Sequence, residues 1–262
     1  KKERLLQMKE LRLRHKGIYH TVCLLISITA ALIVWTAVSA IPDIGSVFVS
    51  PVKVWNALVE NISSGYLWIQ VRDSLIRVIG GFLLGFICSI PVAFLLGWYE
   101  GFRVIVEPWI QFLRTIALIP IVIATFGIGT SAKVAIIFFA VFLTMVVTIY
   151  QGVKNVDVTL IKAARVFDAN DAQIFINVVV PASIPYILTG VRLGLASALT
   201  TLVAAELTGA ATGLGTMIQQ AGMYFKVDVV LMGIVVIGII GFIFDKIVLF
   251  MEKKLTSWQE VK

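Results

Sequence analysis

The segment that is most informative about the fold is IKAARVFDANDAQIFINVVVPASIP, residues 161–185. Its first thirteen residues carry six charged or amide side chains, and two prolines, Pro181 and Pro185, end it. Long apolar runs lie on both sides of it. A polar interruption of this size in so apolar a chain therefore predicts a segment that stands in water between two membrane-embedded helices.

The composition around this segment is that of a membrane protein. The 262 residues are 59% hydrophobic and only 14% charged, with a mean hydropathy of +0.98, whereas soluble domains carry about 25% charged residues. Continuous apolar runs of about 20 residues predict helical crossings, and a barrel would need short alternating strands instead. We expect an all-α, polytopic fold with about six transmembrane helices, near residues 21–41, 74–98, 104–126, 132–150, 182–206 and 229–250.

Lysine and arginine predict the orientation of these spans. Fourteen lie in the N-terminal tail, the C-terminus and the loops on their side, against four in the opposite loops. The positive-inside rule then places both termini and the loop of about residues 151–181 in the cytoplasm. We divide the chain into a basic cytoplasmic tail, 1–20, and a single transmembrane domain, 21–262, whose first helix is expected to be retained. The net charge of +7 is read as membrane anchoring with weak affinity for anionic lipid, not as a nucleic-acid patch.

Several classes of function are disfavoured by what the spans contain. Both histidines, His15 and His20, lie in the tail, and the cysteines, Cys23 and Cys88, fall in apolar runs as expected buried small side chains. No metal-ligand spacing or catalytic set results, so we predict neither a metal site nor an enzyme. The chain also lacks a GxxxxGK[ST] phosphate loop, so any ATP chemistry must belong to a partner.

Other segments give weaker predictions about packing. The loop of residues 42–73 is long enough for an interfacial helix with Pro51 in its first turn, and residues 207–228 suit a re-entrant or packed turn. Glycines spaced four apart, at 81 and 85 and at 190 and 194, let helices approach closely. That approach is expected within the chain, with a subunit contact as the alternative.

The opening segment has the pattern of a short amphipathic helix over residues 156–167. At 100° per residue, Lys162 and Arg165 project from one side. Asp168 can adopt the left-handed turn that ends a helix, and the prolines then predict re-entry into the membrane. An interfacial helix that merely organises the loop is the alternative. The predicted apolar face consists of Val156, Leu160, Ala163, Ala164 and Phe167.

This segment resembles the cytoplasmic loop of ABC-importer permeases, whose pattern is Glu-Ala-Ala, three residues, Gly, nine residues, Ile-x-Leu-Pro. The alanine pair and Pro181 match, while Lys162 replaces the glutamate and Asp168 the glycine. Five further motifs resemble the nitrate/sulfonate/taurine-type subgroup in the family's order. They are Ser74-Leu75-x-Arg77-Val78-x-x-Gly81-Phe82, Phe126-Gly127-Ile128-Gly129, Gly190-Val191-Arg192-Leu193-Gly194, Ala204-Ala205-Glu206 and Gly213-Leu214-Gly215.

The resemblance implies a type I importer permease in a bacterial cytoplasmic membrane. Two such subunits would form the pathway, a pair of cytoplasmic ATPases holding ATP and Mg would drive it, and an extracytoplasmic binding protein would deliver cargo. The cargo is expected to be a small solute, most simply an anion such as nitrate, a sulfonate, taurine or bicarbonate. An amphipathic helix laid in a groove of the ATPase would couple the two, through Leu160, Lys162, Ala163, Ala164, Arg165, Phe167, Asp168 and Pro181.

Charges inside the spans are costly to embed and commonly face an aqueous path or a partner. Arg114 and Arg192 are our candidates to attract an anionic cargo, with Glu206 as gate or partner, and Ser197 and Thr200 could line the path. Internal ion pairs and helix–helix hydrogen bonds are the alternatives. Arg77 and Asp245 lie near span ends, where snorkelling to the interface is expected.

Two other classes of function stay open at this level. One is a secondary transporter or channel that works without an ATPase, and the other is a membrane scaffold whose polar loop recruits a partner. The 162–181 pattern favours the ATP-driven importer, because a secondary carrier has no use for it.

Overall fold

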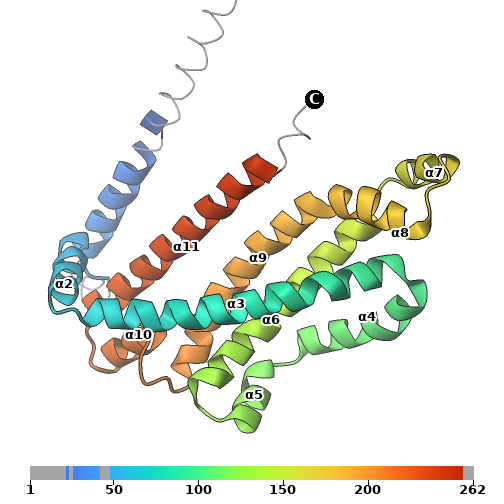
Figure 1. The fold of residues 1–262 in the computed structure, drawn as a ribbon. Coiled ribbons are helices and arrows are strands. Elements are labelled where there is room, and N and C mark those ends of the chain that lie inside the picture. The colour runs from blue at the N-terminus through green and yellow to red at the C-terminus, as the bar shows by residue number, and fades with distance from the viewer. Residues whose placement is uncertain (1–21, 24–25, 42–47, 256–262) are drawn as a thin grey trace, which may run out of the picture.

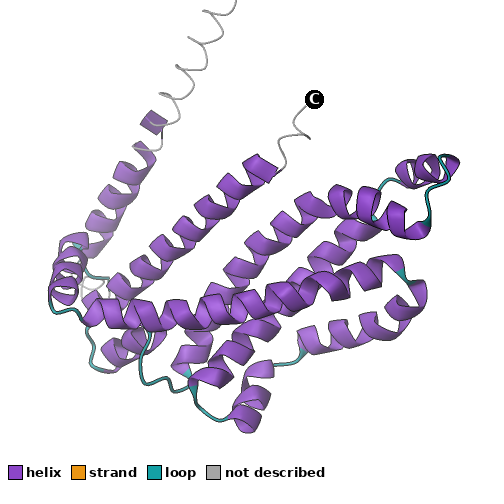
Figure 2. Ribbon diagram, viewed as in Figure 1, coloured by secondary structure: helices purple, strands orange, loops and turns teal. Residues whose placement is uncertain are grey.

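A computed structural model of the chain describes residues 22–23, 26–41 and 48–255, so the predicted basic tail lies outside the described residues. Within these ranges the regular elements are helices (Figures 1 and 2). A helix at Ile26–Ser39 comes first. The others are α2 (Pro51–Ser63), α3 (Tyr66–Trp98), α4 (Glu100–Thr115), α5 (Leu118–Phe126), α6 (Thr130–Lys154), α7 (Val158–Val166), α8 (Asp171–Ile174), the π-helical turn η1 (Phe175–Val179), α9 (Val180–Leu207), α10 (Leu214–Met223) and α11 (Val227–Leu255).

The core is formed by α3, α6 and α9, with α6 in the middle. In the most apolar 18-residue stretch of α6, half of the residues are buried, whereas only 11% are buried in the corresponding stretch of α11. The fully buried side chains include Ile137, Met145 and Ile149, all from α6. Side chains exposed on the outer helices are themselves largely apolar, as expected where a bilayer replaces water as the solvent.

The glycine spacing does let helices approach closely within the chain, as predicted. A Cβ built on Gly81 would lie 2.7 Å from the side chain of Ile137, and one on Gly194 would lie 2.9 Å from Met145. Both neighbours belong to α6. The two glycine pairs therefore seat α3 and α9 against the same central helix.

The two ends of the bundle carry different features. Figure 1 shows α7 and the last turns of α11 toward one end, and α2 and α10 at the other. The predicted helix in the 42–73 loop is confirmed as α2, with Pro51 at its start, and the 207–228 segment forms a loop and the packed helix α10. We call these the α7 end and the α10 end.

The spans differ from the prediction in one crossing. Among the described residues, four helices are long and apolar enough to cross a membrane, and α4 and α5 pass the same test only as a pair that is bent by 90°. The expected single span over 104–126 was therefore wrong, because Ile116 and Ala117 leave the helical conformation. The remaining predicted span is the helix Ile26–Ser39, fourteen residues in its described part.

The expected burial of the cysteines was also wrong. Cys23 and Cys88 are both exposed on helix surfaces. A surface that faces lipid selects the same apolar residues as a core does, so the sequence alone does not separate the two environments.

Candidate functional site

A buried polar network lies at the α10 end and centres on Glu206, the penultimate residue of α9. Its side chain is 0% exposed. One carboxylate oxygen accepts hydrogen bonds from Ser74 Oγ at 2.8 Å and Arg77 Nη1 at 2.6 Å, and the other accepts from the backbone N–H of Gly215 at 2.7 Å. Arg77 is itself only 4% exposed. A carboxylate removed from water in this way needs such a set of donors.

The same network holds the loop between α9 and α10 against α3. Arg77 Nη1 donates to the carbonyl of Thr212 at 2.6 Å, Ser74 Oγ accepts from the N–H of Leu214 at 2.8 Å, and Gln70 Oε1 accepts from the N–H of Gly213 at 2.6 Å. Gly213 has φ +133°, and a Cβ there would collide with the Glu206 carboxylate. Glycine is therefore required at this position.

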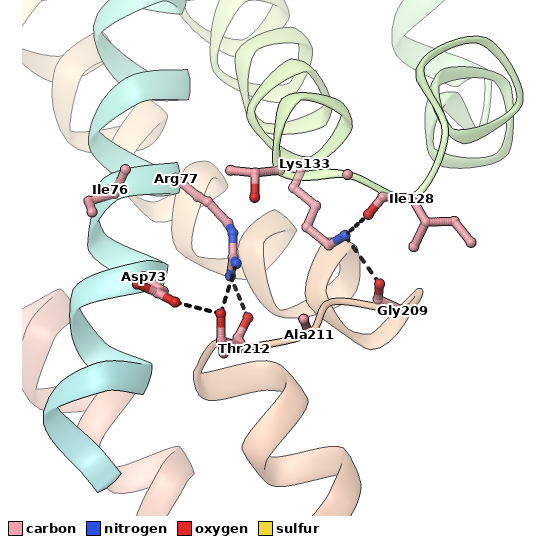
Figure 3. Close-up of a pocket in the computed structure, with 10 residues that line it drawn as sticks. Asp73, Ile76, Arg77, Ile128, Lys133, Gly209, Ala211 and Thr212 are labelled. Atoms are coloured by element: carbon pink, nitrogen blue, oxygen red, sulfur yellow. Dashed lines mark hydrogen bonds between the residues drawn. The ribbon is translucent and has the colours of Figure 1, made fainter. Parts of the chain in front are cut away.

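A second buried cation lies beside the network, across a cavity. Lys133, near the start of α6, is 3% exposed, and its ammonium donates to the carbonyls of Ile128 and Gly209. Figure 3 shows Arg77 and Lys133 extending from two helices toward the loop around Thr212. Both line a cavity of about 380 Å³.

The expectation that Arg77 snorkels to the interface was wrong. Its guanidinium turns inward because Glu206 and the Thr212 carbonyl supply acceptors within the bundle. The sequence motifs contain Ser74, Arg77, Glu206 and Gly213 separately, with no indication that they are neighbours. The presence of polar and glycine residues in each of these motifs was the available signal, since all four residues meet in this one network.

At the α7 end, the segment predicted as an amphipathic helix is an exposed helix followed by a tight turn, as predicted. Asp157 caps α7 by accepting the N–H of Thr159 at 2.8 Å, and this bond lowers the pKa of its carboxyl. Asp168 has φ +55°, which confirms the left-handed turn. Asn170 then starts α8 with a reciprocal capping box to Gln173.

The residues of the predicted apolar face of α7 do not share one environment in the structure. Val156 is buried and precedes the helix, which spans 158–166, and Ala164 packs against the core together with Ile161. Ala164 is half-buried because α7 rests one flank on the bundle, whereas Ala163 is exposed. The exposed apolar flank is made of Leu160, Ala163, Val166 and Phe167. Phe167 is 85% exposed.

The polar side chains of this segment point outward. Lys162 is exposed, and Arg165 lies 3.6 Å from Asp171.

The prediction that the chain re-enters the membrane at a helix started by a proline was wrong, since the helix runs unbroken from Asp171 to Leu207. Pro181 instead follows the π-helical turn, whose wider winding accommodates a ring that clashes with a regular α-helix.

The predicted pathway residues are dispersed. Arg192 forms ion pairs with Asp245 at 3.1 Å and Glu252 at 2.9 Å, the internal pairing that the sequence left open. Ser197 donates to Ala140 across the helix interface, and Thr200 donates within its own helix. Arg114 is exposed in the last turn of α4.

Known proteins with similar sequences and structures all belong to membrane transport systems. Residues 81–257 match the family described as binding-protein-dependent transport system inner membrane component. A probable ABC transporter permease protein of Brucella abortus (strain 2308) is 49% identical over 80% of this chain and 85% of its own. The taurine transport system permease protein of Escherichia coli K12 is 35% identical over 88% of each.

The similarity extends to a nitrate import permease protein of Synechocystis, which is 28% identical over 87% of this chain and 86% of its own. Among solved structures, the inward-facing MetNI methionine ABC transporter superposes with a TM-score of 0.64 at 20% identity. The match covers 73% of this chain and 98% of that one. At this identity, the likeness concerns the fold.

Proposed function

As the chain belongs to the family of binding-protein-dependent transport system inner membrane components, it is a permease subunit of an ABC importer, and we propose that its cargo is a small anion. Nitrate, sulfonates, taurine and bicarbonate are the candidates. Relatives named for taurine, aliphatic sulfonates and nitrate support this class. ATP hydrolysis belongs to a separate ATPase subunit, where ATP and Mg bind, and the permease itself needs no cofactor.

The observation that carries the coupling role is the exposed apolar flank of α7. An apolar strip of this kind in water is typical of a helix that docks in a groove. The end of α11, with Lys253 and Lys254, lies toward the same end of the bundle (Figure 1). We infer that the α7 end is the cytoplasmic end, that both termini are cytoplasmic, and that two permease copies share one ATPase pair.

Reconstitution tests the function directly. The permease is placed in proteoliposomes with its partner ATPase and binding protein, and uptake of nitrate, taurine, methanesulfonate and bicarbonate is measured against an uncharged solute. We expect ATP-dependent uptake of one of the anions. Uptake without the ATPase would instead indicate a secondary transporter, and uptake of the uncharged solute alone would contradict the anion assignment.

One substitution tests the docking flank. Ala163→Trp places a bulky ring on the exposed flank and should abolish ATP-driven uptake while the permease still inserts. Val158→Trp is the matched control, since Val158 is also exposed but projects about 140° away around the helix. Equal loss of uptake in both variants, or in neither, would contradict docking through this flank.

Arg114 is proposed as an attractor of the anion at the bend between α4 and α5. It is exposed and takes part in none of the ion pairs found in the described part of the chain. Arg114→Gln should lower uptake at subsaturating cargo. Arg103→Gln is the control, because Arg103 already pairs with Glu100 at 2.9 Å.

A further inference from the structure

Lys133 is a buried cation that takes part in none of the direct ion pairs among the described residues. No carboxylate lies within 4.0 Å of its ammonium there. Of its three N–H donors, two reach backbone carbonyls, those of Ile128 and Gly209. A buried charge that is solvated but not paired is unfavourable, so the third donor is available to a ligand of opposite charge.

The space in front of Lys133 is suited to such a ligand. The cavity of about 380 Å³ is within the range of sites for small molecules. Gly129 and Thr130, which start the 25-residue helix α6, also line it, and no side chain caps that helix. Its free N–H groups and the positive end of its dipole favour an anion at the same place.

Arg77 adds an independent observation on the same wall. It lines the cavity and is 96% buried, and its Nε has no acceptor among the described residues. Its Nη1 is occupied by Glu206 and the carbonyl of Thr212. Glu206 is thus the direct ion-pair partner of Arg77, while Lys133 lines the same cavity without a direct ion pair in the described part of the chain.

The lining also includes one acid, Asp73 of α3. One of its oxygens accepts a hydrogen bond from the hydroxyl of Thr212, and the other, Oδ1, has no partner in the described part of the chain. In Figure 3, Asp73 and Lys133 lie on opposite sides of Thr212. The cavity therefore has a negative group and a positive group at separate positions, with no direct ion pair between them.

We propose that this cavity is a binding site for the transported solute and that it recognises a small zwitterion, with an oxyanion group at Lys133 and the start of α6 and an ammonium group at Asp73. An amino-sulfonate has this chemistry. The proposal rests on the proposed function for the identity of the ligand as cargo, but the binding site itself is tested separately from transport.

The test is thermal unfolding of the permease–ATPase complex in lipid nanodiscs, without the binding protein. Taurine and sodium methanesulfonate are titrated against sodium gluconate at matched ionic strength. Taurine should raise the unfolding temperature of the wild type at lower concentration than methanesulfonate does, because a ligand stabilises the state that it binds. Lys133→Met should weaken both effects by at least about tenfold, as expected for loss of a charge-assisted hydrogen bond.

Three further variants make the result specific. Asp73→Asn should remove the preference for taurine over methanesulfonate and leave methanesulfonate binding intact. Lys226→Met removes an exposed positive charge from the same end and should change nothing. Lys133→Arg keeps the charge and should retain part of the effect, which separates loss of charge from misfolding.

The outcomes distinguish this site from the proposed function. Absence of any shift in the wild type, or an unchanged shift in Lys133→Met, overturns the site even where anion uptake is observed. Equal binding of taurine and methanesulfonate by the wild type overturns the role of Asp73. A Lys133-dependent shift in a complex that imports none of the anions supports the site and contradicts the assignment of the anion as cargo.

Discussion

The guanidinium of Arg77 and the carboxylate of Glu206, 129 positions apart in the chain, lie 2.6 Å from each other in the interior. The pair joins α3 to the end of α9. Because Glu206 also holds the N–H of Gly215 and Arg77 holds the carbonyl of Thr212, the pair fixes the loop that leads into α10. One ion pair thus sets the relative position of three helices.

Breaking this pair should be strongly destabilising. Arg77→Met leaves a buried, unpaired carboxylate, and we expect a loss of about 3–5 kcal/mol in the free energy of unfolding. The double variant with Glu206→Met should recover much of this loss. Denaturant unfolding in mixed micelles provides the measurement. Arg103→Met, which breaks an exposed pair with Glu100, is the control and should lose no more than about 1 kcal/mol.

The turn after α7 should tolerate glycine and reject branched side chains. Asp168 has φ +55°, a conformation that costs an ordinary residue about 1–2 kcal/mol and glycine almost nothing. Asp168→Gly should therefore keep ATP-driven uptake at the wild-type level, whereas Asp168→Val should reduce it. Equal activity of the two variants would show that the turn is not needed for coupling.

Neighbouring glycines on α3 should respond in opposite ways to the same substitution. Gly81→Ala places a Cβ 2.9 Å from the carbonyl oxygen of Val134, and we expect a loss of about 1–3 kcal/mol from overpacking. Gly80→Ala meets nothing closer than 3.8 Å, so its higher helix propensity should leave stability unchanged or raised by up to about 1 kcal/mol. Thermal unfolding of both variants checks this pair.

The order of α7 should depend on pH only under acidic conditions. Hydrogen bonding from Thr159 lowers the pKa of the Asp157 carboxyl below its ordinary value of 3.8. The folded pKa is thus the lower one, so the stabilisation is fully present above pH 3.8 and is lost as the pH falls through the folded value. Asp157→Asn keeps an acceptor without this titration and should remove the dependence.

A nitroxide label reports this transition. It is attached through Ala163→Cys in a background with Cys23→Ser and Cys88→Ser, since both native cysteines are exposed. Its spectrum should stay constant from about pH 5 to pH 8 and become more mobile below about pH 4. A change centred near pH 6 would point to another group.

The sequence predicted most of the long apolar helices, the helix that starts at Pro51 and the Asp168 turn because each has a local signal. Apolar length, a proline at a helix start and a small polar residue after an amphipathic run all act within a few positions. The bend at Ile116 and Ala117 had a local signal too, which the predicted single span did not take into account. Pro120 lies four residues after Ile116, so in a continuous helix it could not donate to the carbonyl of Ile116 and its ring would clash with it.

The network at the α10 end was missed for a different reason. Arg77 near a span end is compatible with snorkelling or with an inward partner, and only the long-range fold decides between them. The same holds for α7, where helical periodicity placed Ala163 and Ala164 on one face. The bundle partly covers Ala164 and leaves Ala163 exposed. Lys133 carried no local sign that it would be buried.

The unbroken helix from Asp171 to Leu207 has a mechanical consequence. Its 37 residues span about 55 Å at 1.5 Å per residue, well beyond the ~30 Å hydrocarbon thickness. This one helix therefore begins close to α7 and has Glu206 near its last residue. Tilting it by one degree about its midpoint shifts each end by about 0.5 Å in opposite directions. A displacement at the α7 end is thus transmitted to the α10 end with its direction reversed.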